Sequence, residues 1–344
     1  MRVAVVNTQT PFASGSEEWI AARLCELVEV HGHSSELIRI PFCATPPEAI
    51  VDHMLAARLV RLDNVDRAIA LGFPAYFLPH DDKVIWLLRQ FRQAYERWGT
   101  SRQELPSTPL GRNVRASVLA ADRAFLPEAR RLYARSAVAS RRLSNFAGLA
   151  SEILYPPLRD PDMFRCDEYG DYVLALCRIT ADAGQQLAVE AMGLVQGTAR
   201  LVIAGPPDGP GALRALRDVA RALGVDRRVE FIPGALGDAE KVRLLAGCGA
   251  VLCLPEREGC GGRLTLAAFQ SHKPVVVLAA DDEVPEHVRE GVSGRIATSV
   301  TALAAAIDEL AEDSALSRRY GDAAFRQMQD SGISWTSVVQ ELTR

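Results

Sequence analysis

Short runs of aliphatic and β-branched residues alternate with longer amphipathic segments along most of the chain. This alternation is typical of parallel strands joined by helical crossovers, so it predicts an α/β fold. In the first half of the chain we expect strands at residues 2–7, 35–40, 67–71 and 83–88, helices at 17–31 and 47–62, and a mainly helical stretch at 117–146 with short strands near 132–134 and 151–154.

The same alternation restarts near residue 172. It predicts strands at 172–176, 200–203, 229–232, 250–254, 274–277 and 294–296, and helices at 185–195, 213–223, 239–245 and 264–271. Between the two series, residues 155–169 are rich in proline, aspartate and aromatic residues and lack periodicity, which favours a linker between domains.

The two series predict two Rossmann-like domains, an N-terminal one over residues 1–160 and a C-terminal one over residues 170–328. The length of 344 residues agrees with this division, because it exceeds what one hydrophobic core usually supports. Two open sheets in tandem imply a cleft between them, and ligands of such sheets bind outside the carboxyl ends of the strands. Candidate functional residues are therefore expected in the loops that follow each strand.

The composition narrows the class of protein. With 48% hydrophobic and 24% charged residues, the chain has the profile of a globular protein, and its net charge of −4 lacks the basic excess typical of nucleic-acid-binding domains. No apolar run approaches the roughly 18 residues of a membrane span, and the first one is too short for a secretory signal, so we expect a cytoplasmic protein. The seven cysteines show no metal-binding spacing, which predicts reduced, mostly buried thiols and no metal site.

Arginines gather in one part of the N-terminal half at roughly helical spacing: Arg112, Arg115, Arg123, Arg130, Arg131, Arg135, Arg141 and Arg142. A solvated helical face would explain them. The alternative is a surface for anionic lipid heads or for an acidic partner, which would place the protein at the periphery of a membrane.

The loop after the first predicted strand leads through Gly15 and Ser16 into a helix. The free N–H groups and the positive dipole end of such a helix favour an anion or a hydroxyl group. Ser14 or Ser16 acting as an ordinary helix cap is the alternative.

A cationic cluster stands at the end of the strand predicted at residues 83–88, where Arg89 is followed by Arg92. These arginines either face an anionic substrate or pair with nearby acids such as Glu96 and Glu104. The spacing of the residues does not decide between the two interpretations.

Two loops of the second series contain candidate phosphate-binding residues. Arg178 follows the strand predicted at residues 172–176, where its guanidinium would bind phosphate oxygens or pair with Asp182. Residues 254–266, which contain Gly259, Gly261 and Gly262, lead from a buried strand into a helix. Glycines there let backbone amides approach a ligand, so the loop suits a diphosphate, with a tight structural turn as the alternative.

These segments together resemble the retaining GT-B glycosyltransferases of glycosyltransferase family 4. The resemblance covers most of the chain and is carried by residues 3–9, 83–88, 93–95, 201–205, 229–231, 254–266, 268–276, 290–294 and 333–335. It implies the GT-B fold, with two Rossmann-like parallel-sheet domains facing an interdomain cleft. It also implies that residues 329–344 form a terminal helix that packs back on the N-terminal domain, with Trp335 largely buried.

The resemblance further implies which residues act. The implied catalytic residues are Arg178, which matches the arginine of the family's basic pair, Glu258, which lies next to the first of two glutamate positions, and Arg89. The implied donor-binding residues are Gly15, Ser16, Gly205, Gly261, Gly262, Arg263, Leu264 and Thr265. Three positions depart from the family pattern: the expected lysine is Ala183, the second glutamate is Ala267 and the expected histidine is Arg89. Arg89 or Arg92 would then replace the missing positive charge.

The implied activity is transfer of a hexose from a nucleoside diphosphate sugar to a hydroxyl acceptor with retention, without an essential metal or other cofactor. The acceptor would be a saccharide, a lipid-linked molecule or a small molecule, in glycan, polysaccharide or glycolipid biosynthesis. The three departures support an alternative, a GT-B protein that has lost catalysis and acts as a binding or partner subunit. A Rossmann-type oxidoreductase is disfavoured, because no G-x-G-x-x-G motif follows the first strand.

Overall fold

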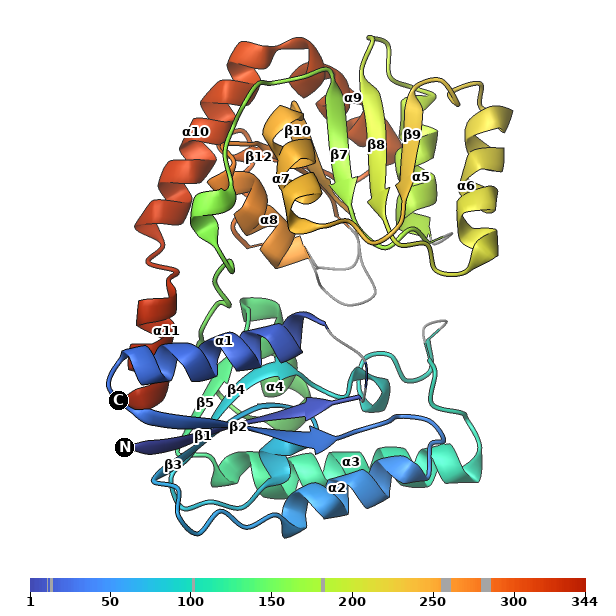
Figure 1. Cartoon of the computed structure of the whole chain (residues 1–344). Helices are drawn as coiled ribbons and strands as arrows, with labels where there is room; N and C mark the ends of the chain where they lie inside the picture. The colour runs from blue at the N-terminus through green and yellow to red at the C-terminus, as the bar shows by residue number, and fades with distance from the viewer. Residues whose placement is uncertain (11, 13–14, 101–102, 181–182, 255–260, 280–285) are drawn as a thin grey trace. The chain divides into compact units, whose positions relative to one another are not determined.

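The computed structural model describes residues 1–10, 12, 15–100, 103–180, 183–254, 261–279 and 286–344. They form two compact units, one of residues 1–156 and 334–344 and the other of residues 157–333. Each unit contains one six-stranded sheet, and every described strand pairing is parallel (Figure 1). The prediction of an α/β chain with two Rossmann-like sheets is therefore confirmed.

The first sheet has the strand order β2-β1-β3-β4-β5-β6. Its strands are β1 (Arg2–Gln9), β2 (Ser34–Pro41), β3 (Arg67–Gly72), β4 (Lys83–Arg89), β5 (Arg131–Ala134) and β6 (Glu152–Ile153). The helices of this unit are α1 (Ser16–Val30), α2 (Ala49–Leu59), α3 (Pro109–Phe125), α4 (Ala137–Ala147) and α11 (Trp335–Thr343), with short 3₁₀ turns η1 (Ala75–Phe77), η2 (Arg92–Ala94) and η3 (Leu126–Glu128).

Alternation along β1 divides the core of this unit into two halves. Val3 and Val5 pack with α1 and α11, whereas Ala4 and Val6 pack with α2, α3 and α4. This is the period-two burial of a strand that is covered on both faces. Figure 1 shows α1 on one face of the sheet and α2 and α3 side by side on the other.

Helix α11 returns to the first unit at the end of the chain. Its side chains Val338, Val339 and Leu342 are fully buried, and the guanidinium of Arg67 donates hydrogen bonds to the last carbonyl groups of the chain. Trp335, the first residue of the helix, is mostly buried, in agreement with the prediction. Its ring packs edge-on against Trp19 and Trp86.

The second sheet has the order β12-β11-β10-β7-β8-β9. Its strands are β7 (Tyr172–Leu176), β8 (Arg200–Gly205), β9 (Val229–Pro233), β10 (Ala250–Cys253), β11 (Val275–Leu278) and β12 (Gly294–Ala297). The helices are α5 (Ala183–Met192), α6 (Pro210–Ala222), α7 (Asp238–Gly247), α8 (Gly261–Gln270), α9 (Val300–Glu312) and α10 (Ser314–Asp330), with the turn η4 (Pro161–Met163). Helices α5, α6 and α9 cover one face of the sheet, and α7 and α8 cover the other.

Several elements differ from the prediction. Helix α3 begins at Pro109 instead of residue 117, because the Thr108 side chain caps it by accepting a hydrogen bond from the Gly111 amide. The gathered arginines therefore lie on α3, on β5 and at its two ends, and on α4, and they do not share one helical face. Helices α9 and α10 are not among the predicted elements, although Ser299 and Asp313 cap them in the same way.

Two further expectations concern the segment between domains and the cysteines. The segment after residue 156 packs on the second unit, where Leu158 is buried in the core.

The six cysteines in the described part of the chain are free thiols, but only Cys248 and Cys253 among them are buried. No helix within the described residues is long and apolar enough to cross a membrane.

Candidate functional site

The second sheet has a topological switch point between β7 and β10. From β7 the chain moves outward through β8 and β9, then returns to β10 and continues in the opposite direction through β11 and β12. Helices that leave two neighbouring strands in opposite directions open a crevice at the carboxyl ends of those strands, where ligands bind in open α/β sheets. Arg178 follows β7 and helix α8 follows β10, so the fold brings these two predicted elements to the same point.

The first turn of α8 offers backbone donors at this point. It begins at Gly261, and its first N–H groups have no partner within the helix. Gly262 is exposed, and a Cβ atom built there would meet nothing within 4 Å, so a ligand has room to approach its amide. Leu264 packs against the core, and the Thr265 hydroxyl is buried 3.5 Å from the Cys253 sulfur. Any donor contact by these two residues would therefore come from their backbone.

Arg263, in the same turn, is partly buried. Its Nε atom is buried without a hydrogen-bond partner among the described residues. A guanidinium in the first turn of a helix lies at the positive end of the helix dipole, which is unfavourable for a cation. A nearby anion would relieve both the buried donor and the unfavourable field.

Arg178 has an exposed side chain, and among the described residues no ion pair or side-chain hydrogen bond involves it. Its backbone is fixed by Gln185 of α5, which is buried. The Gln185 amide nitrogen donates to the Arg178 carbonyl oxygen at 2.6 Å, and its amide oxygen accepts from the Thr180 N–H at 3.0 Å. The alternative partner Asp182 lies outside the described residues, as do Glu258 and Gly259.

Gln185 is a positioning residue that sequence reasoning missed. Its only signal was a polar residue near the start of a helix whose neighbours Ala188 and Val189 are apolar. Its amide satisfies both a carbonyl and an N–H of the loop around Arg178. A buried side-chain amide that makes both bonds holds such a loop in one conformation.

Gly205 supports the same loop from the end of β8. Its φ is +149°, a conformation that L side chains rarely adopt, and a Cβ atom there would lie 2.0 Å from the Cys177 carbonyl oxygen. The close approach of these two backbones requires glycine. Gly205 therefore lets the end of β8 pack against Cys177, the residue that precedes Arg178. This packing explains the glycine at position 205 without any contact to a donor.

The first sheet has its own switch point, between β1 and β3. The N-cap of α1 is Gly15, which offers no side-chain cap, and Ser16 is the first helical residue. Capping by Ser16 is therefore wrong as an explanation, and Ser14 lies outside the described residues. Glu17 and Glu18 occupy the first turn, where negative charge is favourable.

Arg89, at the end of β4, pairs with these two acids. Its Nε lies 2.7 Å from a Glu17 carboxylate oxygen, and its Nη2 lies 4.0 Å from Glu18. Arg92 forms an ion pair with Glu96. The ion-pairing interpretation of the cationic cluster is thus confirmed, but with Glu17 and Glu18 as the partners of Arg89. Acidic side chains of the protein compensate the charges of both Arg89 and Arg92. Neither arginine is therefore assigned the positive charge of the lysine that the resemblance implies at Ala183.

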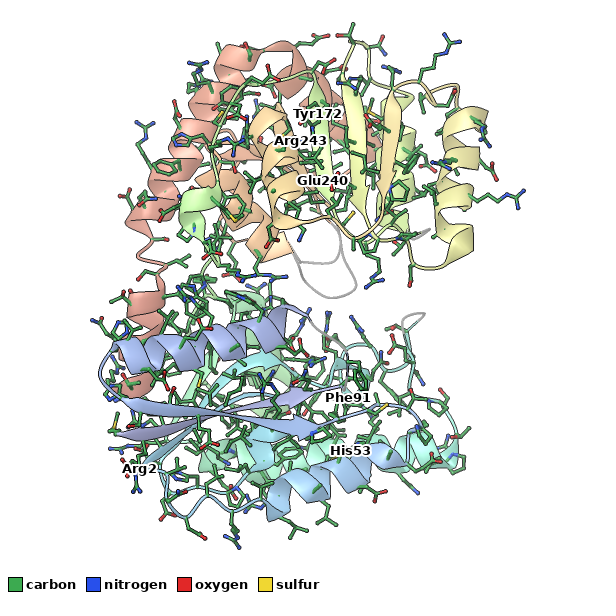
Figure 2. All side chains as sticks on the ribbon, in the orientation of Figure 1. Arg2, His53, Phe91, Tyr172, Glu240 and Arg243 are labelled. Carbon is green, nitrogen blue, oxygen red and sulfur yellow. The ribbon has the colours of Figure 1, made fainter. Side chains whose placement is uncertain are left out.

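The loop after β4 is held by aromatic packing and by a buried carboxylate. Phe91, labelled in Figure 2, stacks on Phe73 with ring centroids 5.0 Å apart. The Tyr76 hydroxyl donates to Asp122 of α3 at 2.8 Å and the Tyr95 hydroxyl donates to its other oxygen at 2.5 Å. Burial raises the pKa of Asp122 to about 6, against the lowering effect of the two tyrosine hydroxyls. Burial also raises the pKa of both tyrosines well above its ordinary value, so they remain donors.

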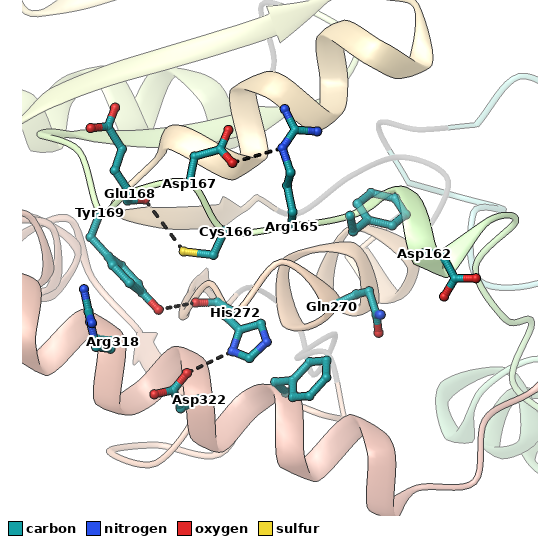
Figure 3. A pocket seen from close by; sticks show the side chains of 12 residues that line it. Asp162, Arg165, Cys166, Asp167, Glu168, Tyr169, Gln270, His272, Arg318 and Asp322 are labelled. Atoms are coloured by element: carbon teal, nitrogen blue, oxygen red, sulfur yellow. Dashed lines mark hydrogen bonds and ion pairs between the residues drawn. The ribbon is translucent and has the colours of Figure 1, made fainter.

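A separate hollow of about 630 Å³ lies in the second unit, between the segment at residues 162–169 and helix α10 (Figure 3). It borders Gln270 and His272 at the carboxyl end of α8. A ten-residue helix is about 15 Å long, so this hollow is distinct from the candidate site at the other end of α8. His272 has a φ of +54°, which is unusual for a residue with a side chain. Its ring stacks on Phe325, and its Nδ1 atom lies 2.8 Å from a carboxylate oxygen of Asp322.

Comparisons with known proteins agree with this architecture. Residues 170–313 match the family model described as glycosyl transferases group 1. No curated protein sequence matches the chain.

Solved structures resemble the chain over nearly its whole length. A glycosyltransferase from Rickettsia africae shares 13% identity with a TM-score of 0.74, covering 100% of this chain and 99% of that one. HepE of Anabaena, solved in complex with UDP and glucose, shares 15% identity with a TM-score of 0.69, covering 99% of this chain and 98% of that one. WaaG, a glycosyltransferase involved in lipopolysaccharide biosynthesis, shares 16% identity with a TM-score of 0.69, covering 100% of both chains. Residues 170–313 are thus similar to the family glycosyl transferases group 1, and the chain as a whole has the GT-B fold of these solved glycosyltransferases.

Proposed function

We propose that this chain is a glycosyltransferase that moves a hexose from a nucleoside diphosphate sugar to a hydroxyl acceptor with retention at the anomeric carbon. The observation that carries the proposal is the convergence of the exposed Arg178 and the first turn of α8 at the switch point of the second sheet. A guanidinium beside unpaired helical N–H groups is a favourable environment for a diphosphate. The structures of HepE with UDP and with UDP-glucose support a nucleotide sugar as the donor class.

In the proposed reaction, the bond between the anomeric carbon and the diphosphate oxygen breaks, and the acceptor hydroxyl forms the new bond on the same face of the sugar. Negative charge accumulates on the leaving diphosphate, which Arg178 and the amides of residues 261–264 would stabilise. The acceptor proton passes to the leaving phosphate, so a side-chain base is not needed. Glu258, outside the described residues, is proposed to bind the sugar hydroxyls.

Arg263 is proposed to supply the second positive charge in place of the lysine that Ala183 replaces. Its buried Nε lacks a hydrogen-bond partner among the described residues, and the helix dipole disfavours a cation at this position. A bound diphosphate would satisfy both conditions. Arg89 is not assigned this role, because Glu17 compensates its charge.

Titration calorimetry with a panel of UDP-, GDP- and TDP-sugars tests the donor class. A donor hydrolysis assay and NMR analysis of the anomeric configuration of the transferred sugar then test turnover and retention. Binding followed by turnover with retention is the expected result. Absence of binding to every donor would contradict the proposal and favour the alternative, a GT-B protein without catalysis that acts as a binding or partner subunit. Binding without turnover would contradict the catalytic part of the proposal.

A further inference from the structure

A lysine and a cysteine that are distant in sequence are in contact in the second unit. Lys273 follows α8, and its side chain is fully buried. Its Nζ atom lies 3.1 Å from the Sγ atom of Cys166, a residue 107 positions earlier in the segment that enters this unit. Because an oxidised cysteine sulfur can form a covalent link to a nearby nitrogen, this contact is a candidate modification site.

The surroundings of Lys273 hold its Nζ atom against the sulfur. The ammonium group also donates a hydrogen bond to the carbonyl oxygen of Glu168 and lies 4.3 Å from the centre of the Tyr169 ring. That ring is fixed in turn, because its hydroxyl donates to the His272 carbonyl oxygen at 2.8 Å. No carboxylate among the described residues forms an ion pair with Lys273, so no acid draws the Nζ atom away from Cys166.

Cys166 is accessible to a small oxidant. It is half-buried and lines the hollow of about 630 Å³ beside α10, where Figure 3 shows it next to Tyr169. Cys248, which interacts electrostatically with both Cys166 and Lys273, is fully buried instead, and burial raises its pKa to about 12. Since oxidants attack the thiolate form, the sulfur open to oxidation here is that of Cys166.

We propose that oxidation by dioxygen joins Cys166 and Lys273 through an S–O–N bridge. An oxygen atom between sulfur and nitrogen keeps these two atoms further apart than a direct S–N bond would. The bridge therefore requires the smaller shift from the observed separation of 3.1 Å. This site lies at the end of α8 opposite the donor site, and it does not depend on the proposed reaction.

The bridge consumes one molecule of dioxygen. Dioxygen adds to the thiol of Cys166 and gives a peroxysulfenic acid, S–O–O–H. The Nζ atom of Lys273, after its ammonium group has lost one proton, attacks the oxygen bound to sulfur. The O–O bond breaks, and the leaving hydroxide takes a proton from the amine and departs as water. One thiol, one neutral amine and one dioxygen thus give one bridge and one water; sulfur and nitrogen lose two electrons each, and dioxygen gains four.

The bridge would fasten the segment at residues 157–169 to the end of α8. It would close a loop between residues 107 positions apart, which restricts the unfolded chain far more than the folded one. Thermal unfolding of the bridged protein should therefore have a midpoint roughly 5 to 10 °C above that of the reduced protein.

Peptide mass spectrometry of the full chain tests the proposal. One sample is kept in air-saturated buffer and a second is kept under nitrogen with dithiothreitol, and both are alkylated and digested with trypsin. In the first sample, peptides 166–178 and 264–289 should be linked. Their mass should exceed the sum of the two by one oxygen atom less two hydrogen atoms. Fragmentation should place the link at Cys166 and Lys273, and dithiothreitol should release it.

Three variants serve this test. Cys166→Ser and Lys273→Arg should each remove the linked peptide and the rise in the unfolding midpoint. Cys177→Ser is the matched control, because Cys177 lies in the same tryptic peptide, and it should leave the link unchanged. Since Lys273 is buried, thermal unfolding of the reduced samples checks folding, and the half-buried Cys166→Ser keeps the test valid if Lys273→Arg fails to fold.

Four results would overturn the proposal. The first is the absence of linked peptides in the aerated protein, and the second is their persistence in Cys166→Ser. The third is a Cys166 that carries oxygen while Lys273 stays unlinked. The fourth is a disulfide between Cys166 and Cys248 in place of the bridge.

Discussion

The Nε atom of Arg89, at the end of β4, lies 2.7 Å from a carboxylate oxygen of Glu17 in the first turn of α1. This pair joins the end of β4 to the helix that follows β1. It also compensates the charge of Arg89, at the position where the resemblance implies a histidine. The cation at this position therefore holds the two elements together and is not available as an isolated charge.

Arg89→Ala should accordingly have small effects. An ion pair with one partly exposed member contributes about 0 to 1 kcal/mol to the free energy of unfolding, so denaturant titration should show a loss within that range. Donor affinity should change by less than about fivefold, that is by less than about 1 kcal/mol, because Glu17 already compensates the charge of Arg89. A loss of donor binding as large as that of an Arg178 variant would show instead that Arg89 contacts the donor.

Arg178→Ala and Arg263→Ala should each weaken binding of the donor or of the free nucleoside diphosphate about 10- to 100-fold, the range expected for hydrogen bonds to charged groups. Titration calorimetry measures this directly. Arg214→Ala, which removes an exposed arginine of α6 in the same unit, serves as the control and should leave the affinity unchanged. If only the Arg178 variant loses affinity, Arg263 does not supply the second charge.

Two glycine substitutions should separate packing from ligand access. Gly205→Ala should lower the free energy of unfolding by about 2 to 4 kcal/mol, because its Cβ would collide with the Cys177 carbonyl group and its positive φ disfavours a side chain. Gly262→Ala should leave stability unchanged or raise it by up to about 1 kcal/mol, since the position is open and alanine favours a helix.

The two variants should also differ in donor binding. If amides at the start of α8 contact the diphosphate, the methyl group of Gly262→Ala should weaken donor affinity while the protein remains as stable as before. Urea denaturation and calorimetry on the same samples make the comparison. Unchanged affinity in a stable Gly262→Ala protein would speak against the proposed contact.

Asp122 should make the stability of the protein depend on pH. Its pKa is raised to about 6 in the folded state, so between about pH 4 and pH 6 the folded protein binds a proton that the unfolded chain has released. The free energy of unfolding should therefore fall as the pH rises through this window and then level off.

Asp122→Asn removes this titration. The cost of the substitution should be larger at the acidic end of the window than above pH 6, by on the order of 2 kcal/mol from a shift of this size. Urea denaturation of both proteins across the window measures the difference. A cost that does not vary with pH would show that the carboxyl group of Asp122 does not titrate there.

His272 offers a test of backbone strain. Its φ of +54° disfavours any residue with a Cβ, while the ring gains a stacking contact with Phe325 and an Asp322 partner. His272→Ala loses these contacts and keeps the strain, whereas His272→Gly loses the contacts and relieves it. The glycine variant should therefore be more stable than the alanine variant by about 1 kcal/mol in thermal or chemical unfolding. Equal stabilities would mean that the observed φ carries no strain.

The pattern of the sequence predicted both sheets because strand burial is local. Alternation such as that of Val3 to Val6 specifies which side chains face each layer of helices, and it can be recognised without knowing what packs there. The same holds for the approximate start of α8, because a glycine-rich bend between a buried strand and an apolar helix is a short-range signal. Helices α9 and α10 were not predicted, although the residues that cap them, Ser299 and Asp313, are also short-range signals in the sequence.

The candidate site was predictable only in part. The positions of Arg178 and of the first turn of α8 follow from the order of strands, and the switch point between β7 and β10 follows from how those strands pair. The clamp formed by Gln185 and the steric demand at Gly205 depend on contacts with the loop around Arg178. These contacts cannot be predicted from the spacing of residue types in the sequence.

The sequence by itself determined that this chain forms two parallel-sheet units and where the loops with anion-binding capacity lie, because hydrophobic period, glycine content and helix starts act over a few residues. Only the tertiary structure decided which charges remain available. Glu17 is distant from Arg89 in sequence, and Tyr76 and Tyr95, whose hydroxyls donate to the buried Asp122, lie 46 and 27 residues away from it. Pairing, burial and exposure depend on distances through space, which the order of residues alone does not contain.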